Sequence, residues 1–191
     1  MAIAERMPEA ARGEDELLVD RFREGDARAF EELVRRHQRA VFHLARRFVR
    51  DDDEAKDVAQ RTFVKAYQGL HALRGGAAFR TWLFRITSNL ALNHLRDNSR
   101  VRPTEDAGVH IPVEAIGADR LDDEERRGQL LAGLGELPPK QKLVLELRVF
   151  QELPFREVAE IAGCTENAAK VNFHHAVKRL RAFIEGKGGA K

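Results

Sequence analysis

The chain has 191 residues, of which 43% are hydrophobic and 34% are charged, and its formal net charge is +2. This composition is typical of a globular protein rather than a disordered one. Its single cysteine, Cys164, excludes a disulfide framework within the chain, and no apolar run approaches the roughly 20 residues that cross a bilayer. We therefore expect a cytoplasmic protein with no direct membrane insertion.

The residue types favour helices. Ala, Leu, Glu and Arg dominate, and runs of alternating β-branched residues are absent, so an all-α fold is expected. Between residues 100 and 127 helical periodicity is lost, and the chain is interrupted at Pro103, Gly108, Pro112 and Gly117. We therefore predict two small helical domains and three flexible segments: domains at 15–99 and 129–185, an acidic linker at 100–128, and flexible ends at 1–14 and 186–191.

The charge is distributed unevenly along the chain. From Val58 to Arg100 there are seven basic residues and one acid, a net +6, whereas Val101 to Gly128 holds four basic residues and eight acids, a net −4. A basic block followed by an acidic one indicates either a polyanion-binding surface joined to a solvated linker, or two ordinary solvated faces. Charge alone leaves both interpretations open.

The first predicted helix begins after Asp26, whose side chain suits the N-cap position. Its apolar residues recur at helical spacing, at Phe30, Leu33, Val34, Val41, Leu44 and Phe48. His37 lies on the same stripe and has no ligand partner nearby in the sequence. We expect a histidine at the edge of the core rather than a metal ligand.

The acidic run from Asp51 to Glu54 marks the start of the next helix. Carboxylates favour this position because the free N–H groups and the helix dipole attract negative charge. A cation site is disfavoured, since the run lacks the glycine turn and the spaced acidic partners of a calcium loop. The inward face of this helix is expected to contain Val58, Phe63, Ala66, Tyr67 and Leu70.

After a glycine-containing loop at 69–78, a third helix is predicted from Phe79 to Arg96. Its apolar face contains Phe79, Trp82, Leu83, Ile86 and Leu90. Steps of four, four and three place a second group on one stripe, namely Arg85, Asn89, Asn93 and Arg96. Such a stripe of cations and amides is either solvated or suited to hydrogen-bond base edges and phosphates.

The second helical region begins near Leu137-Pro138-Pro139, because proline suits a helix start and no helix interior. Its first apolar stripe contains Leu143, Val144, Leu147 and Phe150. A short helix from Pro154 to Ala162 is then expected, stopped by Gly163.

Thr165 caps the last predicted helix, whose inward residues are Ala169, Phe173, Val177, Leu180 and Ile184. A short helix, a glycine turn and a longer helix form the layout of a helix-turn-helix. Cys164 lies in the turn and is expected to be a structural thiol rather than a redox sensor.

No catalytic constellation is present in the sequence. None of the seven histidines has zinc-type spacing with Cys164, and the adjacent His174 and His175 point about 100° apart on a helix. Neither a phosphate-cradling GxxxxGK[ST] run nor a GxSxG motif occurs. We therefore expect no enzymatic activity, no cofactor and no metal.

Four blocks of the sequence stand out together. They are DVAQRTF at 57–63 followed by Ala66-Tyr67, FRTWLFRI at 79–86 followed by Asn89 and Asn93, LPPKQ at 137–141, and FREVAEIAG at 155–163 with VKRLR at 177–181. These blocks resemble the extracytoplasmic-function (ECF) subfamily of the sigma-70 family of RNA polymerase sigma factors, and they occur in that family's order and spacing over roughly residues 15–98 and 129–184.

The resemblance implies roles for the first domain, which is similar to sigma region 2. The helix from Glu54 to Leu70 would bind the clamp helices of the largest subunit of core RNA polymerase, through Asp57, Gln60, Arg61 and Phe63. The loop at 73–78 would hold a base flipped from the −10 element. Recognition and melting of that element would involve Arg74, Arg80, Trp82, Arg85, Asn89, Asn93 and Arg96.

The resemblance also implies roles for the second domain, which is similar to sigma region 4, and for the linker. The last helix would enter the major groove of the −35 promoter DNA, with contacts from Thr165, Glu166, Asn167, Lys170, Asn172, His174, His175 and Lys178. Further partners would be the flap of the second-largest polymerase subunit and an anti-sigma factor. The acidic linker would lie in polymerase channels otherwise occupied by nucleic acid.

The recognition helix departs from the family pattern. The family often carries several arginines there, whereas this chain has acidic, amide, lysine and histidine side chains at the exposed positions. Insertion into the major groove remains compatible with these residues, since asparagine can pair with adenine and lysine can contact guanine or phosphate.

Two other functions would account for part of the sequence. A helix-turn-helix transcription regulator that acts without polymerase would leave residues 54–98 without a purpose. A sigma-like decoy that binds a regulator without DNA would tolerate loss of Asn89, Asn93 and the basic loop, yet all are present. The sequence therefore predicts a sigma factor that binds core polymerase and directs promoter recognition, DNA melting and transcription initiation.

Overall fold

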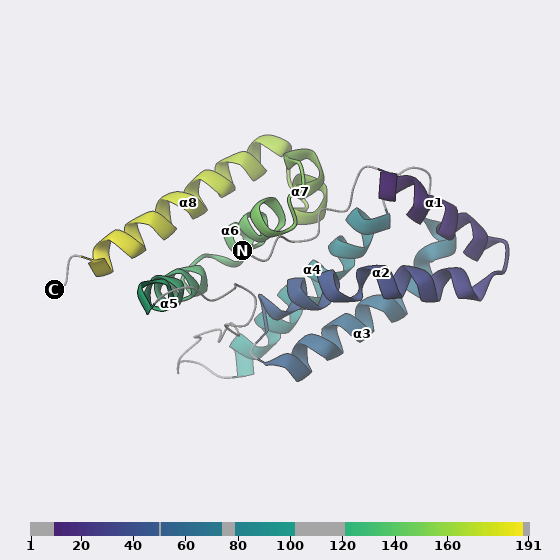
Figure 1. The fold of residues 1–191 in the computed structure, drawn as a ribbon, viewed down its shortest axis with the longest axis horizontal. Coiled ribbons are helices and arrows are strands. Elements are labelled where there is room, and N and C mark those ends of the chain that lie inside the picture. The colour runs from purple at the N-terminus through teal and green to yellow at the C-terminus, as the bar shows by residue number, and fades with distance from the viewer. Residues whose placement is uncertain (1–9, 50, 74–78, 102–120, 189–191) are drawn as a thin grey trace. The chain divides into compact units, whose positions relative to one another are not determined.

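The structure is a computed structural model that describes residues 10–49, 51–73, 79–101 and 121–188 (Figure 1). Every regular element in these ranges is a helix, which confirms the predicted all-α fold. The described residues divide into two compact units, one within 10–99 and the other within 100–188. Within the described ranges, no helix is both long and apolar enough to span a membrane.

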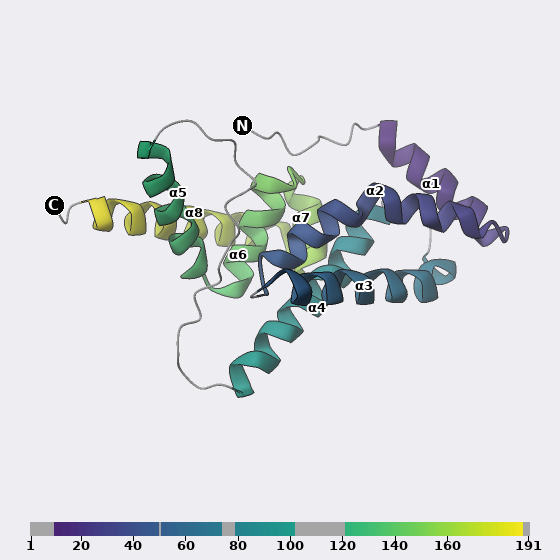
Figure 2. The same ribbon diagram turned by 60° about the horizontal axis from the view of Figure 1, so that its bottom comes forward.

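The described residues of the N-terminal unit form four α-helices and one 3-10 turn. In chain order they are α1 (Ala10–Arg23), α2 (Ala27–Arg46), α3 (Asp52–Gly69), η1 (Leu70–Ala72) and α4 (Phe79–Val101). Helix α2 packs against both α1 and α3, and it lies alongside α3 in two views (Figures 1 and 2).

Side-chain caps begin α2 and α3 at the predicted positions. Asp26 accepts a hydrogen bond from the backbone N–H of Arg28, and Asp51 accepts one from the N–H of Glu54. The Asp51 carboxylate therefore satisfies a free N–H group in the first turn of α3, as expected at a helix N-terminus.

The interior of the N-terminal unit draws on every helix. Among the large apolar side chains that are 0% exposed, α2 supplies Leu33, Val41 and Leu44, α3 supplies Val58, η1 supplies Leu70, and α4 supplies Leu83 and Phe84; α1 adds Leu18, Val19 and Phe22 at 5–6% exposed. Of the residues named here on α2 to α4, the predicted apolar faces lacked only Phe84, and Leu70 is buried as predicted although it lies in η1 rather than in α3. Phe84 lies four and seven residues before Ser88 and Ala91, and all three are buried on one face of α4.

In the C-terminal unit, α8 (Glu166–Gly188) packs against three shorter helices. These are α5 (Leu121–Gly135), α6 (Pro139–Leu145), which continues as the π-helical turn η3 (Glu146–Phe150), and α7 (Phe155–Ala162). As predicted, the prolines open a helix, with Pro138 as the N-cap of α6 and Pro139 in its first turn. A buried cluster of Leu134, Leu137, Leu145 and Ala176 holds the helices together.

The turn between α7 and α8 has the geometry of a helix-turn-helix. Gly163 ends α7 in the left-handed region with a φ of +59°, which favours glycine. The N–H of Cys164 donates to the Ala159 carbonyl at 2.9 Å, and the Thr165 hydroxyl accepts from the N–H of Ala168 at 3.2 Å. The predicted stop and cap of this motif are therefore confirmed.

Four helix limits differ from those expected. Helix α1 begins at Ala10, inside the segment 1–14 expected to be flexible, and α4 continues to Val101. Helix α5 begins at Leu121, inside the expected linker, and α8 continues to Gly188. Tertiary packing explains two of the differences, because α1 buries Leu18, Val19 and Phe22 and α5 packs its leucines on α8.

Candidate nucleic-acid and protein interfaces

An apolar groove of about 450 Å³ opens on α2 and α3. Helix α2 contributes two lining residues and α3 contributes five: Phe30, Val34, Gln60, Phe63, Val64, Tyr67 and Gln68. Val64 is 50% exposed and Tyr67 is 51% exposed, which is unusual for side chains of their size and hydrophobicity. An exposed apolar groove of this kind is suited to receive a helix of another protein.

The predicted polymerase-binding residues divide between the groove and its surroundings. Gln60 and Phe63 line the groove. Asp57 and Arg61 do not line it; both are exposed and form an ion pair with each other at 3.5 Å. An exposed pair of this kind contributes little to stability, so both charges are available to a partner.

Tyr67 was expected to point inward, and this prediction was wrong. Its ring lies edge-on to Phe30 and Phe22, at centroid distances of 5.1 and 5.3 Å, on the rim of the core. Helical spacing placed it beside the buried Ala66, but the phenolic ring extends past the core to the surface. The α2 residues Phe30 and Val34 were likewise expected only as core, although their side chains also line the groove.

Helix α4 presents the predicted polar stripe. Arg85, Asn89, Asn93 and Arg96 are all exposed, while Leu83, Leu90 and Ala91 on the same helix are buried. Arg96 lies 3.9 Å from Asp97, and within the described residues Arg85 forms no ion pair.

The three other residues predicted for the −10 element lie in different surroundings. Arg80 is half-buried, with its guanidinium 5.1 Å from the centre of the Phe84 ring. Trp82 is also half-buried and packs against Phe79 at 6.0 Å and against Gly69, where a Cβ would meet the indole at 3.1 Å. Arg74 lies outside the described residues. Arg80 and Trp82 therefore contribute to packing as well as to the surface.

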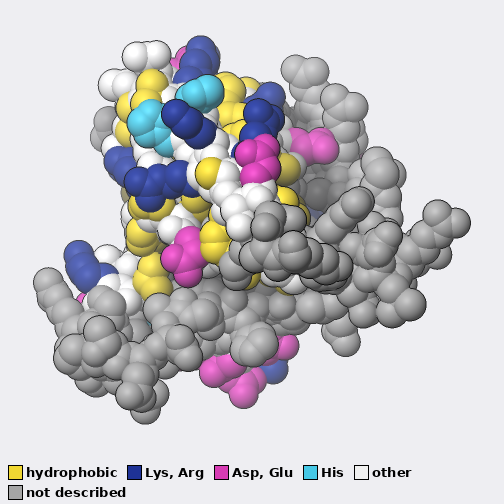
Figure 3. All heavy atoms as spheres, turned by 90° about the vertical axis from the view of Figure 1, so that its left-hand side faces the viewer, with side chains coloured by type: hydrophobic (Ala, Val, Ile, Leu, Met, Phe, Trp, Pro, Cys, Tyr) yellow, Lys and Arg dark blue, Asp and Glu magenta, His cyan; other side chains and the backbone are white. Residues whose placement is uncertain are grey.

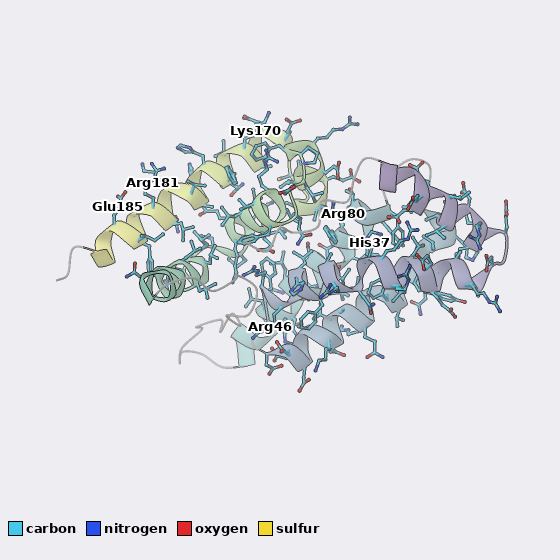
Figure 4. All side chains as sticks on the ribbon, in the orientation of Figure 1. His37, Arg46, Arg80, Lys170, Arg181 and Glu185 are labelled. Carbon is cyan, nitrogen blue, oxygen red and sulfur yellow. The ribbon has the colours of Figure 1, made fainter. Side chains whose placement is uncertain are left out.

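His37 is a fully buried residue rather than a residue at the edge of the core. Its Nε2 and Oδ2 of Asp15 are joined by a 2.6 Å hydrogen bond, and the two side chains are 0% and 5% exposed. Figure 4 labels His37 on α2. The partner lies 22 residues away on α1, in a segment that had not been predicted to be helical. The sequence could not reveal this pair without the packing of α1 on α2.

Around this pair, charged side chains connect α1 to the outside of α2. Arg36 contacts Glu14 of α1 at 2.7 Å and Glu32 of its own helix at 2.9 Å. Hydrogen bonds from Arg35 and Arg36 lower the pKa of Glu32 to about 2. Glu32 therefore stays ionised at physiological pH, and the network that joins the two helices keeps its charge.

The residues predicted to contact the −35 element differ in their surroundings: some bond to other groups of α8, and others are exposed. Lys170 forms an ion pair with Glu166 at 2.7 Å, and the Asn172 amide donates to the Ala168 carbonyl at 2.8 Å from a half-buried position. Thr165, Asn167, His174, His175 and Lys178 are exposed. Asn172 had been grouped with the exposed positions; this was wrong, because its amide is held against its own helix.

The exposed residues of α8 include a stripe of Lys, His and Arg side chains that continues beyond the predicted −35 contacts. Lys170, His174, Lys178 and Arg181 recur at steps of four, four and three, and all four are exposed. Figure 3 shows the histidines of this unit among Lys and Arg side chains, and Figure 4 labels Lys170 and Arg181 along α8. Arg181 was not among the predicted contacts, although the spacing that selected the α4 stripe also selects it.

Cys164 is half-buried in the helix-turn-helix turn and is not part of a disulfide. In the described part of the chain, no three His, Cys, Asp or Glu side chains gather in a way that could hold a metal ion. The polar surfaces of the two units are therefore stripes on helices rather than enclosed sites.

Both units match known protein families. Residues 33–101 match the family Sigma-70 region 2, and residues 127–180 match the family Sigma-70, region 4. The first match spans most of α2 through α4, and the second runs from the middle of α5 through most of α8.

Relatives and solved structures agree with these matches. The RNA polymerase sigma-H factor of Pseudomonas aeruginosa is 36% identical over 182 residues, covering 90% of this chain and 94% of the relative. The ECF RNA polymerase sigma-E factor of Escherichia coli (strain K12) is 34% identical over 189 residues, covering 91% and 93%. CnrH, solved in complex with the cytosolic domain of CnrY, is 27% identical with a TM-score of 0.68, covering 90% of this chain and 97% of CnrH.

A second solved structure, the sigma factor RpoE in complex with the anti-sigma factor NepR from Bartonella quintana, shares the fold with a TM-score of 0.66 at 22% identity, covering 82% of this chain and 96% of RpoE. Two family matches in the expected order, and relatives that share at least 32% of their residues over nine-tenths of the chain, establish the family. The chain therefore belongs to the sigma-70 family of RNA polymerase sigma factors and, within it, to the extracytoplasmic-function group.

Proposed function

We propose that this sigma factor binds core RNA polymerase through the α2–α3 groove, opens the −10 element with α4, and holds the −35 element with α8. The observation that carries the proposal is the pair of exposed stripes, one on each unit, that both follow steps of four, four and three. Each stripe has basic residues at its ends and residues capable of hydrogen bonding between them. Such a surface suits a nucleic acid that offers phosphates and base edges side by side.

The composition of the α4 stripe favours separated strands. Asn89 and Asn93 lie one turn apart between Arg85 and Arg96. Amides can pair with exposed base edges, whereas guanidinium groups hold phosphates at any sequence. Bases of a melted strand are accessible to such amides, so α4 would bind and read the −10 element once it opens.

The composition of the α8 stripe favours duplex DNA. A helix of a helix-turn-helix enters the major groove with its N-terminal residues at base edges. Asn167 and Lys170 lie near that end of α8, and Lys178 and Arg181 lie two to three turns further along. The first pair would reach bases and the second pair would reach the phosphate backbone.

The α2–α3 groove is the surface of the N-terminal unit that we expect to bind a protein partner. Gln60 and Phe63, which the sigma-factor pattern assigns to polymerase binding, line it together with the exposed Val64 and Tyr67. We propose that the clamp helices of the largest polymerase subunit dock here, with the Asp57–Arg61 pair at the rim. The flap of the second-largest subunit would bind the C-terminal unit.

We also propose an anti-sigma partner. CnrH and RpoE were each solved in complex with a partner: the cytosolic domain of CnrY and the anti-sigma factor NepR. A partner that covers the same apolar groove would exclude polymerase, and the free-energy gain from burying Val64 and Tyr67 would be available to either protein. As a sigma factor, the chain would act with polymerase in the cytoplasm and catalyse no reaction itself.

Run-off transcription tests the proposal directly. The chain is mixed with core RNA polymerase and a library of promoters randomised at the −10 and −35 positions, and the transcripts are sequenced. We expect initiation from a defined subset of promoters, and no initiation in a control reaction that lacks the chain. If the chain binds DNA but supports no transcription, an independent regulator is favoured. If it binds neither polymerase nor DNA but only a small helical protein, a decoy is favoured.

A further inference from the structure

Val171 is an apolar side chain on the outward face of α8, where its neighbours are polar. It is 46% exposed and is the sixth residue of the helix. The positions one turn before and one turn after it are Asn167 and His175, and both are exposed. The buried residues of this part of α8, Ala169 and Ala176, are each 0% exposed and lie on the far side of the helix.

Neither core packing nor helix stability accounts for a valine at this position. Nearly half of its surface is accessible, so it contributes little to the core. Valine is also a weaker helix former than alanine, leucine or lysine, because its branched Cβ restricts χ1. Its polar neighbours argue against an apolar patch for a protein partner. The side chain is therefore available to an apolar group on a partner whose other contacts are polar.

The residues on either side of Val171 are already bonded within α8. Lys170 forms its ion pair with Glu166 at 2.7 Å, and the Asn172 amide donates to the Ala168 carbonyl at 2.8 Å. Val171 has no polar side-chain atom to satisfy and lies in the second turn of the helix. A helix that enters the major groove brings its N-terminal residues to the base edges, so this turn lies where bases are read.

The major groove offers an apolar group of one kind. Each base pair displays hydrogen-bond donors and acceptors there, and thymine adds its C5 methyl group, whereas cytosine presents an amino group. Contact between the methyl groups of a valine and of a thymine removes apolar surface of both from water, which is favourable. An outward valine on a DNA-reading helix therefore favours thymine over cytosine at the position that it touches.

We propose that Val171 is a specificity-determining residue for the −35 element and that it selects a thymine through the C5 methyl group. Val171 was not among the contacts predicted from the sequence, all of which are polar. The inference rests on the function proposed above, in which α8 enters the major groove of the −35 element. It adds the identity of the base at one position of that element.

The expected effect is that of burying one methyl group. A buried methyl contributes about 4-fold to binding, which corresponds to about 0.8 kcal/mol. Replacing one thymine by deoxyuridine removes only the C5 methyl and leaves the hydrogen-bonding groups of the base in place. The same contact can therefore be removed from the DNA side or from the protein side.

Val171→Ala removes the contact from the protein side. Alanine is the better helix former, so α8 should persist in this variant. The matched control is Val149→Ala, because Val149 is 49% exposed and belongs to the same unit but lies in η3 rather than on α8. Both variants lose the same two methyl groups from an exposed position.

The experiment measures run-off transcription by each full-length protein with core polymerase, at limiting promoter concentration. The promoter is one selected by the wild-type protein, and each −35 thymine on either strand is replaced in turn by deoxyuridine. We expect one replacement to lower initiation by the wild type about 4-fold. Val171→Ala should lose a similar factor on the unmodified promoter and be insensitive to that replacement. Val149→Ala should behave as the wild type does on both templates.

The proposal is overturned if the selected −35 elements show no preference for thymine, or if no deoxyuridine replacement lowers initiation by the wild type. It is also overturned if Val171→Ala remains fully sensitive to the replacement, or if Val149→Ala loses as much activity. A failure of the proposed function would differ from all of these results, because the wild-type protein would then initiate from no promoter or show no preference at any −35 position.

Discussion

Asn89 and Asn93 lie in the middle of the exposed α4 stripe, and Arg85 and Arg96 lie at its ends. If the amides read bases and the guanidinium groups hold phosphates, alanine variants should fail in different ways. Asn89→Ala or Asn93→Ala should cost about 1–3 kcal/mol at the −10 position that each one reads and relax the base preference there. Arg85→Ala should weaken all promoters alike and reduce the dependence on salt.

Promoter-library transcription at several salt concentrations distinguishes the two outcomes. The α8 variant Lys170→Ala is a useful control, because it should change preference in the −35 element and leave melting intact. The assignment of α4 to the −10 element would be contradicted if Asn89→Ala and Asn93→Ala changed only the −35 preference.

At the same scale, the groove can be tested at its most exposed aliphatic residue. Val64→Asp places a carboxylate among apolar side chains that a partner would cover, and burying that unpaired charge should weaken core-polymerase binding at least ~10-fold, or about 1.4 kcal/mol. Lys65→Asp introduces the same residue one position along, outside the groove lining. Equal binding of the two variants would show that charge, rather than the groove, governs the complex.

At the scale of elements, the turn between α7 and α8 sets the direction of the recognition helix. Gly163 adopts a φ of +59°, so Gly163→Ala should destabilise the C-terminal unit by roughly 1 kcal/mol, since a Cβ is unfavourable in this region. Gly163→Asn should cost less, because asparagine tolerates left-handed conformations. Thermal unfolding followed by circular dichroism measures both, and equal melting temperatures for the two variants would argue against a backbone origin.

The helices that were predicted from sequence are those with strong local signals. Caps at Asp26 and Thr165, the glycine stop at 163 and the apolar stripes of α2 and α4 act over a few residues, so they can be read without a structure. Helices α1 and α5 have weaker signals and owe their positions to packing on α2 and α8. Propensity alone does not place such helices, because most helical stability in proteins comes from tertiary contacts.

The candidate interfaces were also predicted only where the signal lies on one helix. Spacing on one helix identified the α4 stripe, since i+3 and i+4 positions share a face in any helix. The groove required two helices, and Phe30 and Val34 of α2 could be assigned to it only once α2 lay beside α3. The Asp15–His37 bond joins residues 22 positions apart and was missed for the same reason.

At the scale of the whole chain, residues 102–120 connect α4 to α5. The helices extend further than expected, so this connection has 19 residues instead of the 29 in the predicted linker. At most it reaches about 65 Å when extended. Two promoter elements about 17 base pairs apart are separated by about 60 Å at ~3.4 Å per step, so the connection is close to the minimum length if it must span that distance alone.

Linker length should therefore limit the promoter spacing that the protein accepts. Deleting residues 104–113 leaves nine connecting residues and a reach of about 30 Å, so the variant should shift to shorter spacers or lose its dependence on the −35 element. The control retains all 19 residues and replaces Glu105, Asp106, Glu114 and Asp119 with their amides. Transcription from promoters of systematically varied spacer length measures both variants. An unchanged spacer optimum in the deletion would mean that polymerase, rather than the chain, sets the separation of the two elements.

A loss of initiation in the amide control alone would instead support the prediction that the acidic charges occupy a polymerase channel otherwise filled by nucleic acid.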